Sequence, residues 1–206
     1  MLSVAIALAA AAPLRLPPVE LCGGDAEFVQ VREQLDKAVA ARDVDGLIAL
    51  MSEDVRSSFG GGVGREGFKQ RWASAPQERT RLWDELGQAM QLGCAKAVDG
   101  QGREYRAMPA MFVTGDGLDG FSTWVARPGA VLRAKPSVGA KAKMRLPAWT
   151  VLEEVEHDGG DWIEARTPKG SRGFISTAQA RSLLDYRIVF GRRDGRWRIT
   201  AFVAGD

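Results

Sequence analysis

The chain has few of the side chains on which most catalytic sites depend. Its 206 residues contain one histidine and two cysteines. These residues cannot supply the four ligands of a typical zinc site. A nucleophile also needs a base beside it, and Cys94 has no catalytic-cysteine motif around it to pair with His157. We therefore expect no catalytic residue, no metal site and no cofactor.

An excess of one charge is missing too. The chain has 28 Lys and Arg against 26 Asp and Glu, a formal net charge of +2, with both signs spread along its length. A protein that binds a phosphate backbone needs a concentrated basic surface. Nucleic acid is therefore not an expected partner.

Long hydrophobic runs are absent except at the N-terminus. Residues 1–12 form an uncharged, alanine-rich apolar run. A membrane-spanning helix needs about 20 apolar residues, whereas a secretory signal needs fewer and ends in small residues such as Ala9 and Ala11. We predict a signal peptide over 1–12, a periplasmic or secreted protein and no membrane span after cleavage. The alternative is a buried N-terminal helix.

Export changes what the two cysteines indicate. In an oxidising compartment a single disulfide between Cys22 and Cys94 is the first expectation. Lipid attachment at Cys22 is the rival, but the preceding Val19-Glu20-Leu21 has no small residue beside the cysteine.

Three segments of the second half follow one another in an informative order. Residues 131–137 form a short apolar strand, a basic residue and a Pro-Ser turn. Residues 149–152 and 162–166 are β-rich and flank an Asp-Gly-Gly-Asp turn, and residues 169–175 hold a glycine turn followed by Gly-Phe-Ile. This order resembles the bacterial SH3-like domain. The resemblance implies a small β-barrel over 127–183 that binds rather than catalyses.

The aromatic residues of this segment divide into two groups. Trp162 and Phe174 occupy hairpin positions and are expected in the core of the small barrel. Trp149 is the freer ring, and Arg133 and Lys135 could place two cations near it. These three residues are the candidate ligand-binding site for carboxylate-bearing cell-wall glycopeptide (peptidoglycan), or for an envelope protein.

The first hundred residues show helical periodicity. An amphipathic helix is predicted between Asp25 and Arg42. Shorter helices are predicted at 47–51, 65–72 and 80–92. A half-buried strand is predicted at 54–59, and a pair of strands interrupted by Pro109 at 103–113.

The ends of the chain resemble a second family. A long helix followed by segments 41–47 and 51–55 resembles the start of the cone-shaped nuclear transport factor 2 and ketosteroid isomerase fold. Residues 186–190 and 197–203, joined by a turn with Asp194-Gly195, form a strong hairpin signal and resemble its closing strands.

The expected fold class is therefore α+β, with N-terminal helices, an antiparallel sheet and an SH3-like barrel. In this division residues 25–126 and 186–206 form the body, and the barrel is inserted before the C-terminal hairpin. The simpler alternative is one α+β domain in which the hairpin packs beside the barrel.

Two functions follow. The main hypothesis is an exported, non-enzymatic envelope protein that binds through the SH3-like segment. The alternative is a cone-fold enzyme or small-ligand binder with an accessory barrel. Carboxylates converging in the cone with a tyrosine would favour an enzyme, whereas a cone filled by tryptophan and phenylalanine would favour a binder. The residues concerned are Glu53, Asp54, Asp84, Glu85 and Tyr105 for the first case, and Trp83, Trp197 and Phe202 for the second.

Overall fold

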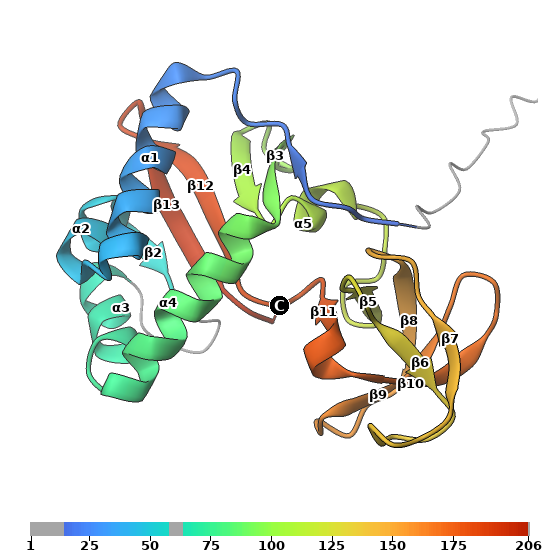
Figure 1. The fold of residues 1–206 in the computed structure, drawn as a ribbon. Helices are drawn as coiled ribbons and strands as arrows, with labels where there is room; N and C mark the ends of the chain where they lie inside the picture. The colour runs from blue at the N-terminus through green and yellow to red at the C-terminus, as the bar shows by residue number, and fades with distance from the viewer. Residues whose placement is uncertain (1–14, 58–63, 206) are drawn as a thin grey trace, which may run out of the picture.

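A computed structural model describes residues 15–57 and 64–205 (Figure 1). The predicted signal peptide at 1–12 lies outside the described residues. Two sheets and a layer of helices make up the described chain, so the α+β class is confirmed.

The first sheet has six strands in the order β1-β3-β4-β12-β13-β2. Its central strands pair antiparallel, whereas the edge strands β1 and β2 pair parallel with β3 and β13. The strands are β1 (Val19–Glu20), β2 (Met51–Arg56), β3 (Gly93–Val98), β4 (Glu104–Met108), β12 (Arg187–Arg193) and β13 (Arg196–Val203).

Helices cover one face of this sheet (Figure 1). They are α1 (Ala26–Ala41), α2 (Val44–Ala49), α3 (Gly64–Trp72) and α4 (Pro76–Gln91). The Asp25 side chain caps α1 by accepting a hydrogen bond from the Phe28 amide, and Pro76 starts α4, where its missing N–H is not needed. The predicted helices are confirmed, except that Met51 belongs to a strand.

The C-terminal hairpin is confirmed as β12 and β13. Asp194 and Gly195 both have positive φ at its turn, which is the conformation that an Asp-Gly pair favours. The strand pair predicted at 103–113 is wrong in its second half. After Pro109 the chain forms a short helix, α5 (Met111–Thr114), because proline cannot donate a hydrogen bond to a continuing ladder.

The second sheet has seven strands in the order β11-β5-β8-β9-β10-β6-β7. The strands predicted near 131, 150, 162 and 173 are all present, and β5, which precedes residue 127, also belongs to this sheet. The strands are β5 (Thr123–Ala126), β6 (Val131–Arg133), β7 (Ala142–Arg145), β8 (Val151–Glu156), β9 (Trp162–Arg166), β10 (Arg172–Ser176) and β11 (Ala180–Ser182), with a 3-10 turn at Thr177–Gln179.

The expected core positions of Trp162 and Phe174 are wrong. The buried residues of β9 and β10 are their neighbours Ile163, Ala165 and Ile175, whereas the two rings are only half-buried. Successive side chains of a strand point to opposite faces, so a shift of one residue exchanges core and surface.

A small apolar cluster joins the two sheets. It contains Leu16, Leu92, Met111, Val125 and Leu183. Arg127, which directly follows β5, also donates a 3.0 Å hydrogen bond to Gln88 of α4. The second sheet is therefore in direct contact with the part of the chain that holds the first sheet and its helices. Among the described residues, no helix is long and apolar enough to cross a membrane.

Candidate ligand-binding groove

The space between the helices and the first sheet is filled by aromatic side chains. Trp83, Trp197 and Phe202 are all buried there. Phe28 packs edge-on against Phe190, with ring centroids 5.0 Å apart. The space between the helices and the first sheet, where a cone-fold protein would have its cavity, is therefore a packed core in the described chain.

The carboxylates that a cone-fold enzyme would need do not converge in this core. Glu53 and Asp54 line a separate polar hollow of about 600 Å³. Asp84 is exposed on α4, and Glu85 faces Asp185 and Arg181 near the second sheet. Tyr105 lies on the other side of the first sheet, in the groove described next.

A groove of about 970 Å³ occupies the sheet face that the helices leave uncovered. Along β12, Ile188 and Phe190 point into the core, so Val189 and Gly191 face the groove. Its walls come from α5 and the turn after it, from the β3–β4 turn and from the end of the second sheet; their apolar members are Val98, Phe112, Val113, Leu118, Leu183 and Leu184.

Arginines supply one side of the groove. Arg56 ends β2 and is exposed, and Arg193 forms an ion pair of 3.4 Å with Asp54. Arg187 is buried, with its guanidinium 4.7 Å from the ring centre of Phe112 and a 2.8 Å hydrogen bond to the Gly205 carbonyl. Cationic groups therefore adjoin an apolar wall.

Tyr105 occupies the opposite side of the groove, together with two aspartates. Burial raises the pKa of Tyr105, and the negative charges of Asp116 and Asp99 raise it further. The phenol stays protonated at neutral pH and can donate a hydrogen bond. Asp99 is already engaged, because Arg103 binds it through both its backbone and its guanidinium.

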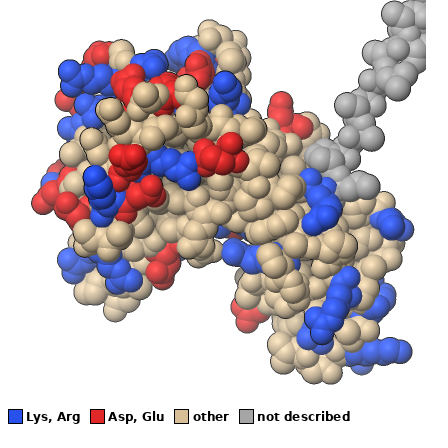
Figure 2. Space-filling view, turned by 45° about the horizontal axis from the view of Figure 1, so that its top comes forward, with Lys and Arg blue, Asp and Glu red and all other residues tan. Residues whose placement is uncertain are grey.

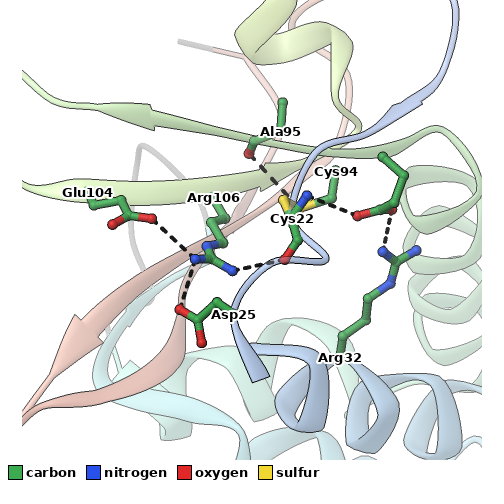
Figure 3. The surroundings of a disulfide bond; sticks show 8 residues. Cys22, Asp25, Arg32, Cys94, Ala95, Glu104 and Arg106 are labelled. Carbon is green, nitrogen blue, oxygen red and sulfur yellow. Dashed lines mark hydrogen bonds and ion pairs between the residues drawn. A yellow bond between two sulfur atoms is a disulfide. The ribbon is translucent and has the colours of Figure 1, made fainter. Parts of the chain in front are cut away.

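A second polar cluster surrounds the disulfide (Figure 3). The Cys22–Cys94 bond predicted from sequence is present, with Cα atoms 5.7 Å apart. Arg106 donates to the Cys22 carbonyl and to Asp25, at 3.2 and 2.9 Å. The close approach of Glu20 to both sulfur atoms is no metal site, because a disulfide offers no thiolate.

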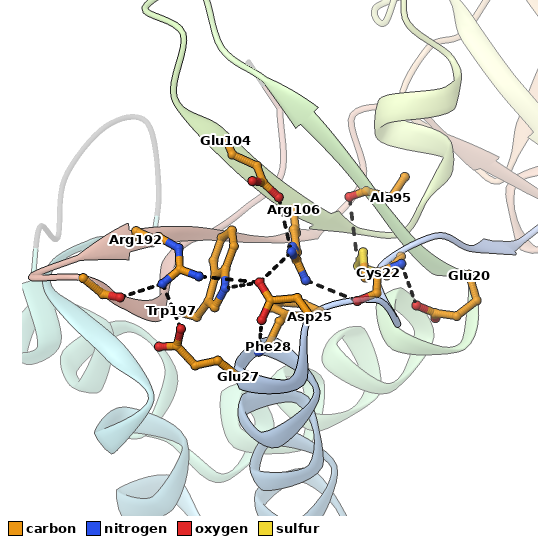
Figure 4. Close-up of polar contacts among 12 residues, drawn as sticks. Glu20, Cys22, Asp25, Glu27, Phe28, Ala95, Glu104, Arg106, Arg192 and Trp197 are labelled. Atoms are coloured by element: carbon orange, nitrogen blue, oxygen red, sulfur yellow. Dashed lines mark hydrogen bonds and ion pairs between the residues drawn. A yellow bond between two sulfur atoms is a disulfide. The ribbon is translucent and has the colours of Figure 1, made fainter.

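Asp25 is the centre of this cluster (Figure 4). Partial burial raises its pKa, but hydrogen bonds from the Phe28 amide and the Trp197 indole, with the charges of Arg106 and Arg192, outweigh this effect. The net result is a pKa below the usual range for aspartate. These contacts tie α1 to β4, β12 and β13, so the cluster is structural.

This lowered pKa predicts an acid-dependent loss of stability. Because the folded state holds Asp25 ionised, its contribution is present above the unfolded pKa of about 4 and disappears as pH falls through the lower folded value. We expect Asp25→Asn to flatten the decline in the free energy of unfolding below about pH 4, measured by urea titration. Asp36→Asn, an exposed change on the same helix, should keep the wild-type slope. Equal slopes for all three proteins would contradict the assignment.

The predicted site residues lie apart from the groove. Trp149 is half-buried against the cluster that joins the sheets, and its carbonyl accepts a hydrogen bond from Leu16. Arg133 donates to the Ala140 carbonyl at 2.9 Å, and Lys135 is exposed in the following loop. The contacts of Trp149 and Arg133 involve different segments of the chain.

The sequence did not predict this groove, because the residues that line it come from five distant segments. The alternation of small and polar residues on β12 and β13 was the available signal, since Gly191 and Thr200 occur where a buried sheet face would carry large apolar side chains.

No protein-family model matches the chain, and no curated protein matches it significantly. Among solved structures, Aln2 from a Streptomyces species is 9% identical with a TM-score of 0.34, over 86% of this chain and 85% of that one. A protein of unknown function with a cystatin-like fold from Nostoc punctiforme is 10% identical with a TM-score of 0.29, over 90% and 93%. An NTF2-like protein with a cystatin-like fold from Novosphingobium aromaticivorans is 14% identical with a TM-score of 0.27, over 86% and 77%. At these scores none of the three assigns a family to this chain.

Proposed function

We propose that this protein is an exported binder of a small amphipathic ligand that carries a negative charge. The observation behind the proposal is the groove of about 970 Å³ on the open face of the first sheet. Its volume lies near the upper end of the range of small-molecule sites, and its lining combines apolar side chains with charged ones that could fix the orientation of a ligand.

The arrangement of charge favours an anionic ligand. Arg56 is exposed at the rim, and among the described residues it forms no ion pair. A carboxylate or phosphate could accept hydrogen bonds from it, while the apolar part of the ligand packs on Val189 and Phe112. Tyr105 would donate a hydrogen bond to a polar atom at the far end.

Binding without catalysis is the form of this proposal that the residues support. The groove lining contains no histidine, cysteine or lysine in the described chain. Of its three carboxylates, Asp99 is held by Arg103 and Glu104 pairs with Arg106, so these two are already engaged. Asp116 forms no ion pair among the described residues, and no general acid or base stands beside it in the lining except Tyr105, whose raised pKa keeps the phenol protonated at neutral pH.

Export is part of the same proposal. The disulfide and the lack of a membrane-spanning helix among the described residues are compatible with a periplasmic or secreted protein. Oxidising conditions would keep Cys22 and Cys94 joined.

A second candidate function is that of an SH3-like module that binds cell-wall glycopeptide or an envelope protein. It is supported by the order of strands β6, β8, β9 and β10. On the outer face of this sheet, Phe174 pairs directly with Arg133 and Glu164. Phe174 is therefore a half-buried ring on the same sheet face as Arg133.

The groove is tested with an anionic aromatic dye, 8-anilinonaphthalene-1-sulfonate, by fluorescence titration of the folded protein. Val189→Trp places a large ring on the groove floor and should weaken binding by about tenfold or more. Arg56→Gln should lower the affinity for the anionic dye about tenfold but leave the affinity for a neutral naphthalene dye unchanged.

Leu21→Trp is the matched control, because Leu21 is exposed and outside the groove. It should bind the dye like wild type, and all variants should keep the wild-type circular dichroism spectrum. Wild-type affinity in Val189→Trp would show that the dye does not enter the groove and would overturn the proposal.

A further inference from the structure

The hairpin of β6 and β7 concentrates positive charge. Residues 120–152 contain no Asp or Glu, although the whole chain is nearly balanced. Within that stretch, the hairpin and its loop carry Arg133, Lys135, Lys141, Lys143 and Arg145. We call these five residues the basic hairpin.

These cations are available to a partner. All but Arg133 are exposed, and β7 is an edge strand of the second sheet. Lys143 and Arg133 donate to the backbone carbonyls of Arg172 and Ala140. In the described chain, no ion pair involves any residue of the basic hairpin. Their charge is therefore not neutralised within the protein.

Two apolar side chains lie exposed among these cations. Val138, in the loop between the strands, is 80% exposed, and Met144 on β7 is 38% exposed. Burying them would be favourable, but no part of the described chain covers them. The exposure of Val138 in the loop and of Met144 on β7 is a feature independent of the charge.

Outside the second sheet, acidic residues slightly outnumber basic ones. Residues 121–183 carry ten Lys and Arg against six Asp and Glu, so the remainder carries 18 against 20. Figure 2 shows mostly blue side chains on the part that holds the second sheet, while red and blue ones are mixed on the helical part. A negatively charged plane would therefore attract the part that holds the second sheet more strongly than the rest of the molecule.

We propose that the basic hairpin docks the protein on the surface of a bilayer that contains anionic phospholipid. Cations near such a surface are attracted to the headgroups, while an apolar loop tip enters the region between headgroups and acyl chains. A nucleic acid or a polar glycopeptide would use the cations but would leave Val138 and Met144 in water. The lipid surface accounts for both features.

The test is flotation of the full-length mature protein with two sets of vesicles, phosphatidylcholine alone and phosphatidylcholine mixed with phosphatidylglycerol. The protein should float only with the second set, and added salt should release it. Lys141→Gln, Lys143→Gln and Arg145→Gln together should lower the partition coefficient by roughly a hundredfold, since each cation contributes about a factor of five.

The control variant carries the same loss of charge on the other part of the molecule: Lys37→Gln, Arg79→Gln and Lys96→Gln, all at exposed positions. It should float like wild type. Val138→Ser should reduce flotation without changing the net charge, which separates insertion from simple charge attraction.

Three results would overturn the proposal. They are equal flotation with both vesicle sets, an equal loss in the control variant, and retention on isolated cell wall without flotation. The last result would instead assign the basic hairpin to the glycopeptide. The circular dichroism spectrum of each variant should match that of the wild type, which shows that a loss of flotation is not caused by unfolding.

Discussion

Replacing Arg106 by alanine should destabilise the protein by about 3–5 kcal/mol. The Arg106 side chain is only 5% exposed, and its guanidinium lies 4.4 Å from the ring centres of both Phe28 and Trp197. Its removal would leave a cavity between the rings. It would also leave the Asp25 carboxylate without its closest cation.

Urea unfolding followed by tryptophan fluorescence and circular dichroism would measure this loss. Arg103→Ala is the matched control, since it removes an arginine–aspartate pair just before the same strand at a site where the arginine side chain is 68% exposed. Exposed pairs contribute little, so the control should cost less than about 1 kcal/mol. If the two variants lost similar amounts of unfolding free energy, the burial of Arg106 between aromatic rings would contribute nothing to stability.

Removing the disulfide should have a comparable effect. The bond joins residues 72 positions apart, so its loss should lower the free energy of unfolding by roughly 4 kcal/mol in the chain-entropy model. It fastens the segment that carries β1 to β3, and the Cys22 carbonyl is also an acceptor for Arg106. The double variant Cys22→Ser, Cys94→Ser avoids leaving a free thiol.

Reductant supplies the control for this prediction. It should lower the melting temperature of the wild-type protein towards that of the double variant, and it should leave the double variant unchanged. Intact-mass analysis with alkylation should find no free thiol in the mature native protein before reduction. Two reactive thiols at that point would contradict the bond.

Local signals in the sequence determined the elements whose formation depends on neighbouring residues. The helical spacing of apolar residues gave α1, and the Asp194-Gly195 turn between two β-rich segments gave the C-terminal hairpin. The chain has two cysteines, so the pairing of Cys22 with Cys94 needed only an oxidising environment.

Some elements carry no such local signal. Strands β5, β7 and β11 are three or four residues long, and each is stabilised by partners that lie elsewhere in the chain. Short strands have weak periodicity, and their formation depends on the sheet that receives them. The sequence therefore predicted the centre of the second sheet but not its edges.

The site depended on tertiary structure alone. Whether a ring such as Phe174 lies in the core or on the surface is set by strand register, and one residue of shift reverses it. The groove needs Arg56, Tyr105 and Arg187 on one sheet face, and these residues come from three strands that join one sheet only after folding. The amino-acid sequence by itself determined the α+β class, the main helices and hairpins and the disulfide pair, because those depend on short-range patterns or on counting. Which side chains share a surface was decided by the pairing of distant strands, because no local pattern records that pairing.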